Sequence, residues 1–373
     1  MIKVLCVFGT RPEAIKMAPV IMKLREMKDD FYVVAVSTGQ HTDMVYSVMK
    51  DFDVNIDLDL KIMKKKQSLN YITEEIIHGI DNILHCSAPD IVLVHGDTTT
   101  SMATALAAYH RGIPVGHVEA GLRSYDDRNP WPEEMNRVMV DRLSSFHFAP
   151  TERASENLRK EGLTANIYVT GNTVIDALKH TLGPDVDVTD KTLDLMNIEK
   201  KIILVTAHRR ENWGTPLRNI CKALKEIVHL RSDVEIIYAV HPNPNVRDAV
   251  YGILSGITGV RLISPPNYMD FANLMNVAHI VLTDSGGLQE EAPALGKPVL
   301  VMRKTTERPE AILAGTAKLV GTEVDSIRSG VYDLLTDEKK YEKMATADNP
   351  YGDGTASEKI AQALLQDFKK KGK

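Results

Sequence analysis

The stretch IVLTDSGGLQEE, residues 280–291, joins an apolar run to two adjacent glycines and then to a helix start. A strand that enters a helix through a tight turn is the unit of parallel α/β sheets. Glycines let the backbone approach a bound group, and the first N–H groups of a helix lack intrahelical acceptors, so the turn suits an anion. Ser285 can donate a hydroxyl, and Glu290 or Glu291 can accept from a sugar hydroxyl. We therefore expect a ligand with phosphate and ribose, although the same pattern also occurs as plain packing.

Short β-branched apolar runs alternate with longer helix-period stretches along the chain. Such alternation predicts βαβ units, and continuous apolar strands predict parallel sheets that helices cover on both faces. The fold class we expect is α/β, with two Rossmann-like doubly wound domains that face each other across a cleft. Ligands of such sheets bind beyond the carboxyl ends of the strands. The predicted strands are residues 4–8, 33–36, 91–94, 114–118, 202–205, 236–240, 280–282 and 299–302.

A chain of 373 residues exceeds the usual domain size of about 100 to 200 residues, which also predicts two domains. The weakest periodicity lies at residues 182–201, and the join is expected between residues 171 and 201. We predict an N-terminal domain over residues 1–175 and a C-terminal domain over residues 176–355, which carries the glycine turn at 284–287. The last helix-period segment, residues 356–369, follows a turn-rich stretch and either closes one lobe or crosses back to the other.

Composition narrows the classes of function. The net charge of −5 shows none of the basic excess that nucleic-acid binding needs. Cys6, Cys86 and Cys221 are far apart and in no ligand spacing, which favours a reducing cytoplasm and small buried side chains over disulfides or structural zinc. The N-terminus enters a strand without a leader, and no apolar run approaches the ~18 residues that span a bilayer. We expect a cytoplasmic protein without a membrane or nucleic-acid partner.

Charged residues collect where the strands of the first half end. Arg11 follows the first strand and Lys16 lies in the next helix, while Asp97 and Glu119 follow the third and fourth main strands. A cation at a strand end can meet a diphosphate or a sugar hydroxyl, but a surface arginine beside a proline is equally consistent with Arg11. Asp97 can instead cap the helix that follows it. Glu119 beside a glycine is less easily explained by capping.

Further charges flank these strand ends. Glu133 opens a helix after a proline-rich loop, where a carboxylate suits either catalysis or the helix start. His208 and Arg209 follow the strand at 202–205, at a switch from strand to loop. Three carboxylates and a histidine in one cleft suit proton transfer at carbon, and the arginines and the glycine turn suit a diphosphate.

Metal binding is the rival use of the strand-end histidines and carboxylates. The candidates would be His95, Asp97, His117 and Glu119. Their spacing matches no recognised ligand pattern, so we expect no metal.

With these residues assembled, the chain resembles the non-hydrolysing UDP-N-acetylglucosamine 2-epimerases of envelope-sugar pathways. The resemblance covers nearly the whole length and implies a homodimer with two glycosyltransferase-B-like domains in each chain. It implies that the first domain carries the catalytic carboxylates, that the second binds UDP, and that the C-terminal helix, 356–373, packs back on the first domain. It rests on FGTRPEAIKMAPV (8–20), HGDTTT (95–100), GHVEAGLRS (116–124), PWPEEMNR (130–137), TGNTVIDAL (170–178), TAHRREN (206–212), DSGGLQEEAPALGKPVLVMR (284–303) and NPYGDG (349–354).

The resemblance implies reversible interconversion of UDP-N-acetylglucosamine and UDP-N-acetylmannosamine, without metal, nicotinamide or another cofactor, to supply N-acetylmannosamine-type sugars for cell-envelope polysaccharide. A base removes the proton from sugar carbon 2 as UDP leaves carbon 1. Protonation of the resulting 2-acetamidoglucal on the other face and return of UDP then give the epimer.

The same resemblance implies roles for individual residues. The proton-transfer carboxylates fall on Asp97, Glu119 and Glu133, and Arg137 and His208 lie near the reacting sugar and the leaving diphosphate. The implied contacts with the UDP-sugar are Arg11, Lys16, Arg209, Phe271 beside uracil, Ser285, Gly286 and Gly287 as the diphosphate cradle, Glu291 on the ribose, and Arg308 as a further cation.

A possible regulatory site departs from the family pattern. Some bacterial members bind a second UDP-N-acetylglucosamine as activator through a Gln-His pair, a second glutamine and an arginine. Gln40 and His41 are present here, but Asp43 and Lys66 stand at the other two positions. A carboxylate cannot donate as an amide does, and lysine lacks the bidentate fork of arginine. We predict weak or absent activation, and a Hill coefficient clearly above one would contradict it.

Four other functions fit parts of the pattern. A glycosyltransferase of the same fold would need an acceptor groove, and a hydrolysing epimerase would let water capture the intermediate. A 2-epimerase for a UDP-3-acetamido uronic acid would share all these motifs. A nucleotide-sugar-binding regulator could lose the carboxylates, whereas this chain keeps all three.

Overall fold

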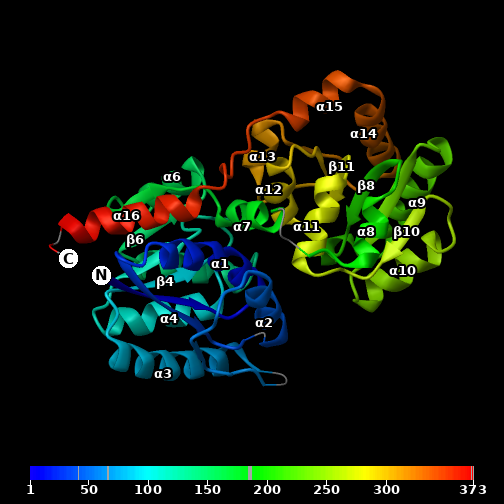
Figure 1. The fold of residues 1–373 in the computed structure, drawn as a ribbon. Coiled ribbons are helices and arrows are strands. Elements are labelled where there is room, and N and C mark those ends of the chain that lie inside the picture. The colour runs from blue at the N-terminus through cyan, green and yellow to red at the C-terminus, as the bar shows by residue number, and fades with distance from the viewer. Residues whose placement is uncertain (41, 65–66, 184–186, 371, 373) are drawn as a thin grey trace. The chain divides into compact units, whose positions relative to one another are not determined.

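We analysed a computed structural model of the chain, which describes residues 1–40, 42–64, 67–183, 187–370 and 372. The chain divides into two compact units (Figure 1). The first unit comprises Met1–His180 and Tyr351–Lys373, and the second comprises Thr181–Pro350.

Within the described residues, the first unit holds a sheet of seven parallel strands in the order β3-β2-β1-β4-β5-β6-β7. The strand order reverses between β1 and β4, which is where doubly wound sheets bind ligands. Gly9, Asp97 and Glu119 lie in the turns that follow the carboxyl ends of β1, β4 and β5. The strands are β1 (Ile2–Phe8), β2 (Phe31–Ser37), β3 (Leu58–Asp59), β4 (Ile91–His95), β5 (Val115–Val118), β6 (Phe146–Ala149) and β7 (Ile167–Val169).

Helices cover both faces of this sheet, with α1 and α16 on one side and α3 and α4 on the other (Figure 1). The C-terminal helix α16 lies in the first unit. The carboxylate of Asp176 caps its start by accepting from the N–H groups of Ala356 at 3.2 Å and Ser357 at 2.8 Å. The helices are α1 (Arg11–Glu26), α2 (Thr42–Asp51), α3 (Leu69–Ser87), α4 (Thr99–His110), α5 (Glu133–Leu143), α6 (Glu152–Lys160), α7 (Thr173–Thr181) and α16 (Ala356–Lys370).

The second unit repeats this plan, with six parallel strands among its described residues in the order β10-β9-β8-β11-β12-β13. Its switch point lies between β8 and β11, which end before the His208 loop and the Asp284 turn. The strands are β8 (Lys201–Thr206), β9 (Val234–Ala239), β10 (Val260–Ile263), β11 (Ile280–Thr283), β12 (Val299–Val301) and β13 (Ala317–Leu319).

The helices of the second unit flank these strands, and α9 packs against α10 and α14 while α8 packs against α11. They are α8 (Asp190–Met196), the 3-10 turn η1 (Arg210–Asn212), α9 (Thr215–Leu230), α10 (Pro244–Leu254), α11 (Tyr268–Val277), α12 (Gly286–Ala294), α13 (Pro309–Ala314), α14 (Val324–Thr336) and α15 (Glu338–Ala345).

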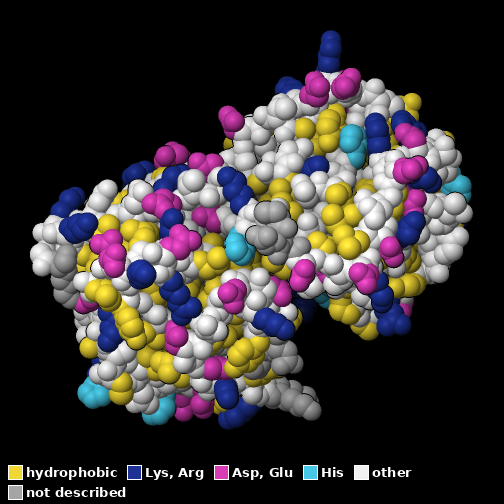
Figure 2. Space-filling view, in the orientation of Figure 1, with side chains coloured by type: hydrophobic (Ala, Val, Ile, Leu, Met, Phe, Trp, Pro, Cys, Tyr) yellow, Lys and Arg dark blue, Asp and Glu magenta, His cyan; other side chains and the backbone are white. Residues whose placement is uncertain are grey.

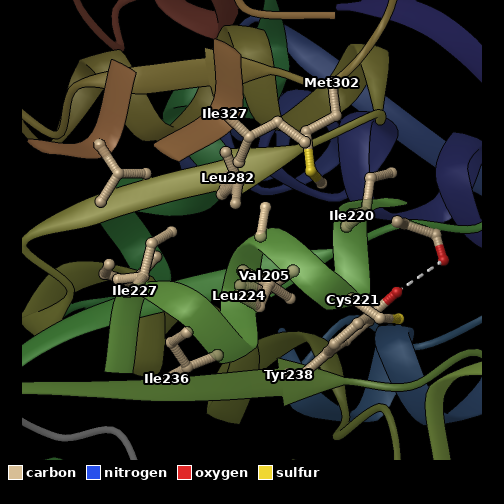
Figure 3. Packing of buried hydrophobic residues seen from close by; sticks show 14 of the residues in the cluster. Val205, Ile220, Cys221, Leu224, Ile227, Ile236, Tyr238, Leu282, Met302 and Ile327 are labelled. Atoms are coloured by element: carbon tan, nitrogen blue, oxygen red, sulfur yellow. Dashed lines mark hydrogen bonds between the residues drawn. The ribbon is translucent and has the colours of Figure 1, made fainter. Parts of the chain in front are cut away.

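The core beneath this sheet also anchors the loop that follows β8. Apolar side chains of α9, among them Ile220 and Leu224, pack onto β8 and β9 (Figure 3). Tyr238 is fully buried and its hydroxyl donates to the carbonyl of Ala207 at 3.3 Å (Figure 3). Burial raises the pKa of Tyr238 well above its usual value, so the phenol stays protonated as a donor. The residue just before His208 is thereby tied to the core.

The expected fold class is confirmed, because both sheets are parallel and both show the doubly wound strand order. The sequence pattern missed strands β3, β6, β7, β10 and β13. Four of these are short strands at or near a sheet edge, and β6 (FHFA) interrupts its apolar run with a histidine. Edge and mixed strands lack the continuous apolar signal of buried central strands.

The surface and the cysteines add two findings. On the face drawn in Figure 2, acidic and basic side chains are interspersed. No helix among the described residues is long and apolar enough to cross a membrane. Burial raises the pKa of the Cys6 and Cys221 thiols to about 12, as expected for small core side chains. Cys86 is exposed at the end of α3, so the expectation that it is buried was wrong.

Candidate active site

The turn after β1 brings three elements of the first unit close together. The carboxylate of Glu13 accepts from the N–H groups of Gly9 at 3.0 Å and Thr10 at 2.8 Å. A Cβ at Gly9 would lie 2.2 Å from the hydroxyl of Thr38 and 2.3 Å from that of Thr100, so only glycine fits. This turn starts α1, whose first residue is the half-buried Arg11.

Glu119 lies at the end of β5 against groups from three other elements. Its Oε2 pairs with Lys16 of α1 and accepts from Nδ2 of Asn172 at 2.8 Å. His95 Nε2 lies 3.6 Å from the same oxygen. Glu119 has a φ of 69°, a left-handed conformation that costs a non-glycine residue of order 1 kcal/mol and that concentrates at functional sites. Capping does not account for this carboxylate.

Asp97 follows the end of β4 and pairs through one carboxylate oxygen with an arginine of α5. Its Oδ2 accepts from Arg137 Nε at 3.0 Å and Nη2 at 2.6 Å. Asn136 fixes the backbone beside it by donating to the Asp97 carbonyl at 2.8 Å. Thr98, not Asp97, caps α4, because the Thr98 hydroxyl accepts from the N–H of Ser101 at 3.1 Å. The capping role considered for Asp97 is therefore wrong.

Two adjacent glutamates at the start of α5 differ in their surroundings. Glu134 accepts from the N–H groups of Ser124 and Tyr125, each at 2.9 Å, and from Arg137 at 3.0 Å. Glu133 Oε2 is buried and has no hydrogen-bond partner among the described residues. An unsatisfied buried carboxylate oxygen costs about 1–3 kcal/mol or more. Glu134 therefore organises the loop, while Glu133 is left with an oxygen that a ligand can use.

A buried cluster of charged side chains connects the turns that carry Asp97 and Glu119. His117 bonds Asp141 at 2.6 Å through Nδ1 and the Gly96 carbonyl at 2.8 Å through Nε2. Arg123 pairs with the other oxygen of Asp141 at 2.8 Å, and Gly121 N–H donates to that oxygen at 3.3 Å. Burial acts to raise the pKa of Asp141, but His117 and Arg123 outweigh it and hold the pKa below its usual value. The cluster joins the turns that carry Asp97 and Glu119.

In the second unit, Asp284 ties the ends of β8 and β11 together. Its Oδ2 accepts from the N–H groups of His208 and Arg209 and from Nδ2 of Asn212, each at 2.9 Å. The side chain is fully buried. Asp284 therefore fixes the loop that presents His208.

His208 lies half-buried beside this carboxylate and beside another histidine. Its Nδ1 is 3.4 Å from Asp284 Oδ1, and its ring stacks on that of His241 with centroids 5.4 Å apart. Burial lowers the pKa of His208, and Arg209 and His241 lower it further, against the opposing charge of Asp284. The imidazole is therefore neutral at pH 7.

The glycine turn after β11 forms the N-terminus of α12. The Ser285 N–H donates to the Thr283 hydroxyl at 2.9 Å, and the Ser285 side chain forms no capping bond to the helix. A Cβ at Gly286 would lie 2.9 Å from Glu307 Oε1, and one at Gly287 would lie 3.4 Å from Glu291 Oε1. The N-terminus of α12 supplies the N–H donors of an anion cradle, while two carboxylate oxygens lie beside its glycines.

A carboxylate of the same unit lies at this cradle. Glu307 Oε1 accepts from Arg209 Nη2 at 3.0 Å, and Glu307 Oε2 pairs with Arg303. Burial acts to raise the pKa of Glu307, but Arg303, Arg209 and Arg308 outweigh it and hold the pKa below its usual value. Glu307 is therefore an anion at the position where a diphosphate is expected.

The remaining nucleotide-side candidates have partners within the second unit. Glu291 Oε2 accepts from the Tyr268 hydroxyl at 3.1 Å. Arg308 Nε pairs with the buried Glu290. Phe271 is half-buried on α11, one turn from Tyr268.

The regulatory candidates can be placed only in part. Gln40 is half-buried after β2, and its Oε1 accepts from the Thr100 hydroxyl at 2.8 Å. His41, Lys66 and the side chain of Asp43 lie outside the described residues. Across the described parts of the chain, no three His, Cys, Asp or Glu side chains are grouped as metal ligands.

Known proteins resemble this chain over nearly its whole length. The family model for UDP-N-acetylglucosamine 2-epimerase matches residues 23–365. The UDP-N-acetylglucosamine 2-epimerase of Escherichia coli K12 is 51% identical over 371 residues, which cover 97% of this chain and 98% of that protein. The chain belongs to the UDP-N-acetylglucosamine 2-epimerase family. The resemblance inferred from the sequence is therefore confirmed.

Solved structures of the epimerase family extend this result to the fold. The UDP-GlcNAc 2-epimerase of Neisseria meningitidis, solved with UDP-GlcNAc bound, is 48% identical and matches with a TM-score of 0.89 over 98% of this chain and 100% of that one. A glycotransferase of kitacinnamycin shares only 13% identity, yet matches with a TM-score of 0.64 over 97% of this chain and 98% of that one. The latter likeness concerns the fold alone.

Sequence reasoning gave no role to four polar residues that the structure places at the candidate site. Asn172 and Asp284 lie in the quoted segments TGNTVIDAL and DSGGLQEE, so their position in a family match was a usable signal. Asp141 and Glu307 lie outside the quoted segments. Their importance comes from partners distant in the sequence, which no local pattern reveals.

Proposed function

We propose that this protein interconverts UDP-N-acetylglucosamine and UDP-N-acetylmannosamine without hydrolysing the nucleotide sugar. The observation that carries the proposal is the identity of about half of all residues, over nearly the full length, with named UDP-N-acetylglucosamine 2-epimerases. A relative of similar identity was solved with UDP-GlcNAc bound.

The first unit supplies the proton transfers. A carboxylate removes the proton from carbon 2, the electrons of that bond form the carbon 1–carbon 2 double bond, and the carbon 1–oxygen bond to UDP breaks. Asp97, Glu119 and Glu133 are the proposed acid–base residues. Asp97 and Glu119 are carboxylates that follow the ends of β4 and β5, and Glu133 begins α5 with a buried carboxylate oxygen that no described residue hydrogen-bonds. Arg137 neutralises and aims Asp97 through two hydrogen bonds.

The second unit binds UDP and stabilises it as a leaving group. The N-terminus of α12, with Ser285, Gly286 and Gly287, would hold the diphosphate. Arg209 would add positive charge as UDP departs, and His208 would do so after the diphosphate has raised its pKa and it has taken up a proton. Removal of one comparable donor costs about 3–4 kcal/mol of transition-state stabilisation. Glu291, which Tyr268 holds in place, would accept from ribose.

Four further residues are proposed to contact the UDP-sugar. Phe271 would lie beside uracil, and Arg308 would add a cation on the nucleotide side. Arg11 and Lys16 would contact the substrate from the first unit.

The second half-reaction returns a proton to carbon 2 and UDP to carbon 1. A second carboxylate protonates carbon 2 of the 2-acetamidoglucal on the opposite face, and the UDP oxygen adds again to carbon 1. Substrate and product are isomers and no electrons leave the sugar, so the reaction needs no redox cofactor. Opposite protonation states of two carboxyl groups require environments that differ, as they do for Asp97 and Glu133.

We further propose that the enzyme acts as a cytoplasmic homodimer and feeds a polysaccharide pathway of the cell envelope. Proton and phosphorus NMR of the protein with UDP-N-acetylglucosamine tests the activity. UDP-N-acetylmannosamine as the only new sugar is the expected product. Free N-acetylmannosamine with UDP would contradict the non-hydrolysing reaction, and unchanged substrate would contradict the activity.

A further inference from the structure

Asn172 lies in the segment TGNTVIDAL, which the proposed reaction does not use. It sits between β7 and α7 and is buried, with 2% of its surface exposed. A buried amide needs partners for both of its ends. The partners of Asn172 decide which way its side chain points.

Local bonds fix the orientation of the Asn172 amide. Its Oδ1 accepts from the N–H of Val174, the second residue of α7, at 3.0 Å, which is the bond of a helix N-cap. Its backbone N–H donates to the Tyr351 carbonyl at 2.7 Å. With the oxygen engaged at the helix, the NH₂ end is turned to Glu119 Oε2 at 2.8 Å.

The loop that holds Asn172 rests on the segment where the chain returns to the first unit. A Cβ at Gly171 would lie 3.1 Å from the Tyr351 carbonyl oxygen and 3.2 Å from Gly352 Cα. Gly171 has a φ of 89°, which an L side chain rarely adopts. The backbone at Gly171 is thus packed closely against Tyr351 and Gly352, so Asn172 cannot shift without moving this segment.

Glu119 Oε2 consequently faces a cation, an amide and a histidine. Lys16 pairs with it from α1, Asn172 donates to it from the turn before α7, and His95 of β4 lies 3.6 Å away. The lysine has a long flexible stem, whereas the asparagine is short and held at its other end. Of these two donors, Asn172 is the one that can set the direction of the carboxylate.

We propose that Asn172 is a positioning residue that holds Glu119 in the orientation and the ionised state needed for proton transfer. The inference rests on the proposed function, because it assigns Glu119 to the acid–base step. The amide donates a hydrogen bond to the carboxylate and thereby favours its charged form. It contacts Glu119 and need not touch the substrate.

Two substitutions separate this role from helix capping. In Asn172→Ser the hydroxyl can still accept from the Val174 N–H, but the shorter side chain no longer reaches Glu119. In Asn172→Asp a carboxylate oxygen caps the helix equally well, but a second negative charge faces Glu119, and adjacent carboxyl groups resist joint ionisation.

We expect kcat to fall about tenfold in Asn172→Ser and about a hundredfold in Asn172→Asp. The whole acid–base step contributes about 10²–10⁴-fold, and a misdirected carboxylate loses only part of it. KM should change little in both, since the substrate contacts remain. The acidic limb of the pH–rate profile should move to higher pH in Asn172→Asp. Wild-type kcat in both folded variants, or a raised KM with unchanged kcat, would overturn the proposal.

Asn157→Ser is the matched control. Asn157 is another buried amide of the first unit, which donates to the Gly121 carbonyl at 3.0 Å and accepts from the Tyr125 hydroxyl at 2.9 Å. This control should lose stability without a shift in the pH–rate profile, and an equal shift there would overturn the proposal. If Asn172→Asp fails to fold, Asn172→Ser still decides. An inactive wild-type protein would instead overturn the proposed function.

Discussion

In the first unit two of the candidate carboxylates, Asp97 and Glu119, lie against hydrogen-bond donors, whereas in the second unit candidate cations lie against carboxylates of their own unit. Asp97 is held by two hydrogen bonds from Arg137, and Glu119 by Lys16 and Asn172. Arg209, in contrast, pairs with Glu307, which itself lies at the glycine cradle.

This difference separates two ways of preparing a site. Charges that already face their working partners are pre-organised and need no rearrangement during the reaction. Charges that neutralise one another must exchange partners when an anion binds. We therefore expect the acid–base groups to be rigid before substrate arrives and the diphosphate site to rearrange on binding.

The largest effect is expected on the free energy of unfolding, when the buried carboxylate of Asp141 is neutralised. Asp141→Asn leaves His117 and Arg123 without their shared charge in the core, and breaking a buried pair costs about 3–5 kcal/mol. Arg209→Ala removes an exposed pair worth about 0–1 kcal/mol. Calorimetric unfolding of both variants measures the contrast, and equal losses of stability would break it.

Asp97→Asn tests whether the first unit serves the chemical step and not nucleotide binding. We expect turnover to fall about a hundredfold or more, because a lost general acid or base has that scale, while UDP affinity stays nearly unchanged. Steady-state rates and titration calorimetry with UDP measure the two quantities. If UDP affinity fell and turnover survived, Asp97 would belong to nucleotide binding.

Glu307→Gln tests whether the second unit must exchange partners. Removing this charge frees Arg209 and clears the anion from the cradle, so UDP should bind ~3- to 5-fold more tightly, the scale of one exposed ion pair. Glu211→Gln is the control, since Glu211 pairs with Arg303 at 2.6 Å. Weaker UDP binding by Glu307→Gln would mean that Glu307 positions Arg209 for the ligand.

The smallest effect concerns the protonation of His208. Its pKa lies below the usual value in the ligand-free protein, and a nearby diphosphate should raise it, so binding takes up a proton. UDP-N-acetylglucosamine should therefore bind a few-fold more tightly as pH falls from about 8 to about 6. Calorimetry on the Asp97→Asn protein, in buffers of different ionisation enthalpy, measures the uptake. His208→Asn should abolish it, and unchanged uptake would contradict the assignment.

The sequence predicted the parts of this molecule that depend on local pattern. The apolar runs of the central strands predicted two parallel sheets. In each unit the residues that follow those strands lie at the carboxyl end of the sheet. Asp97, Glu119 and His208 were therefore identifiable as candidates before any contact was known.

The partners of these residues could not be predicted in the same way. The left-handed backbone of Glu119, the amide of Asn172 beside it, and the placement of Glu307 at Gly286 depend on segments far apart in the sequence. Such contacts follow from how loops pack on the finished sheets, and no periodicity encodes them.

Elimination and re-addition require a carboxylate that exchanges the hydrogen at sugar carbon 2 with solvent. Proton NMR of the wild-type protein with UDP-N-acetylglucosamine in deuterated buffer tests this step directly. We expect UDP-N-acetylmannosamine with deuterium at carbon 2. An epimer that keeps the original hydrogen would contradict elimination and re-addition.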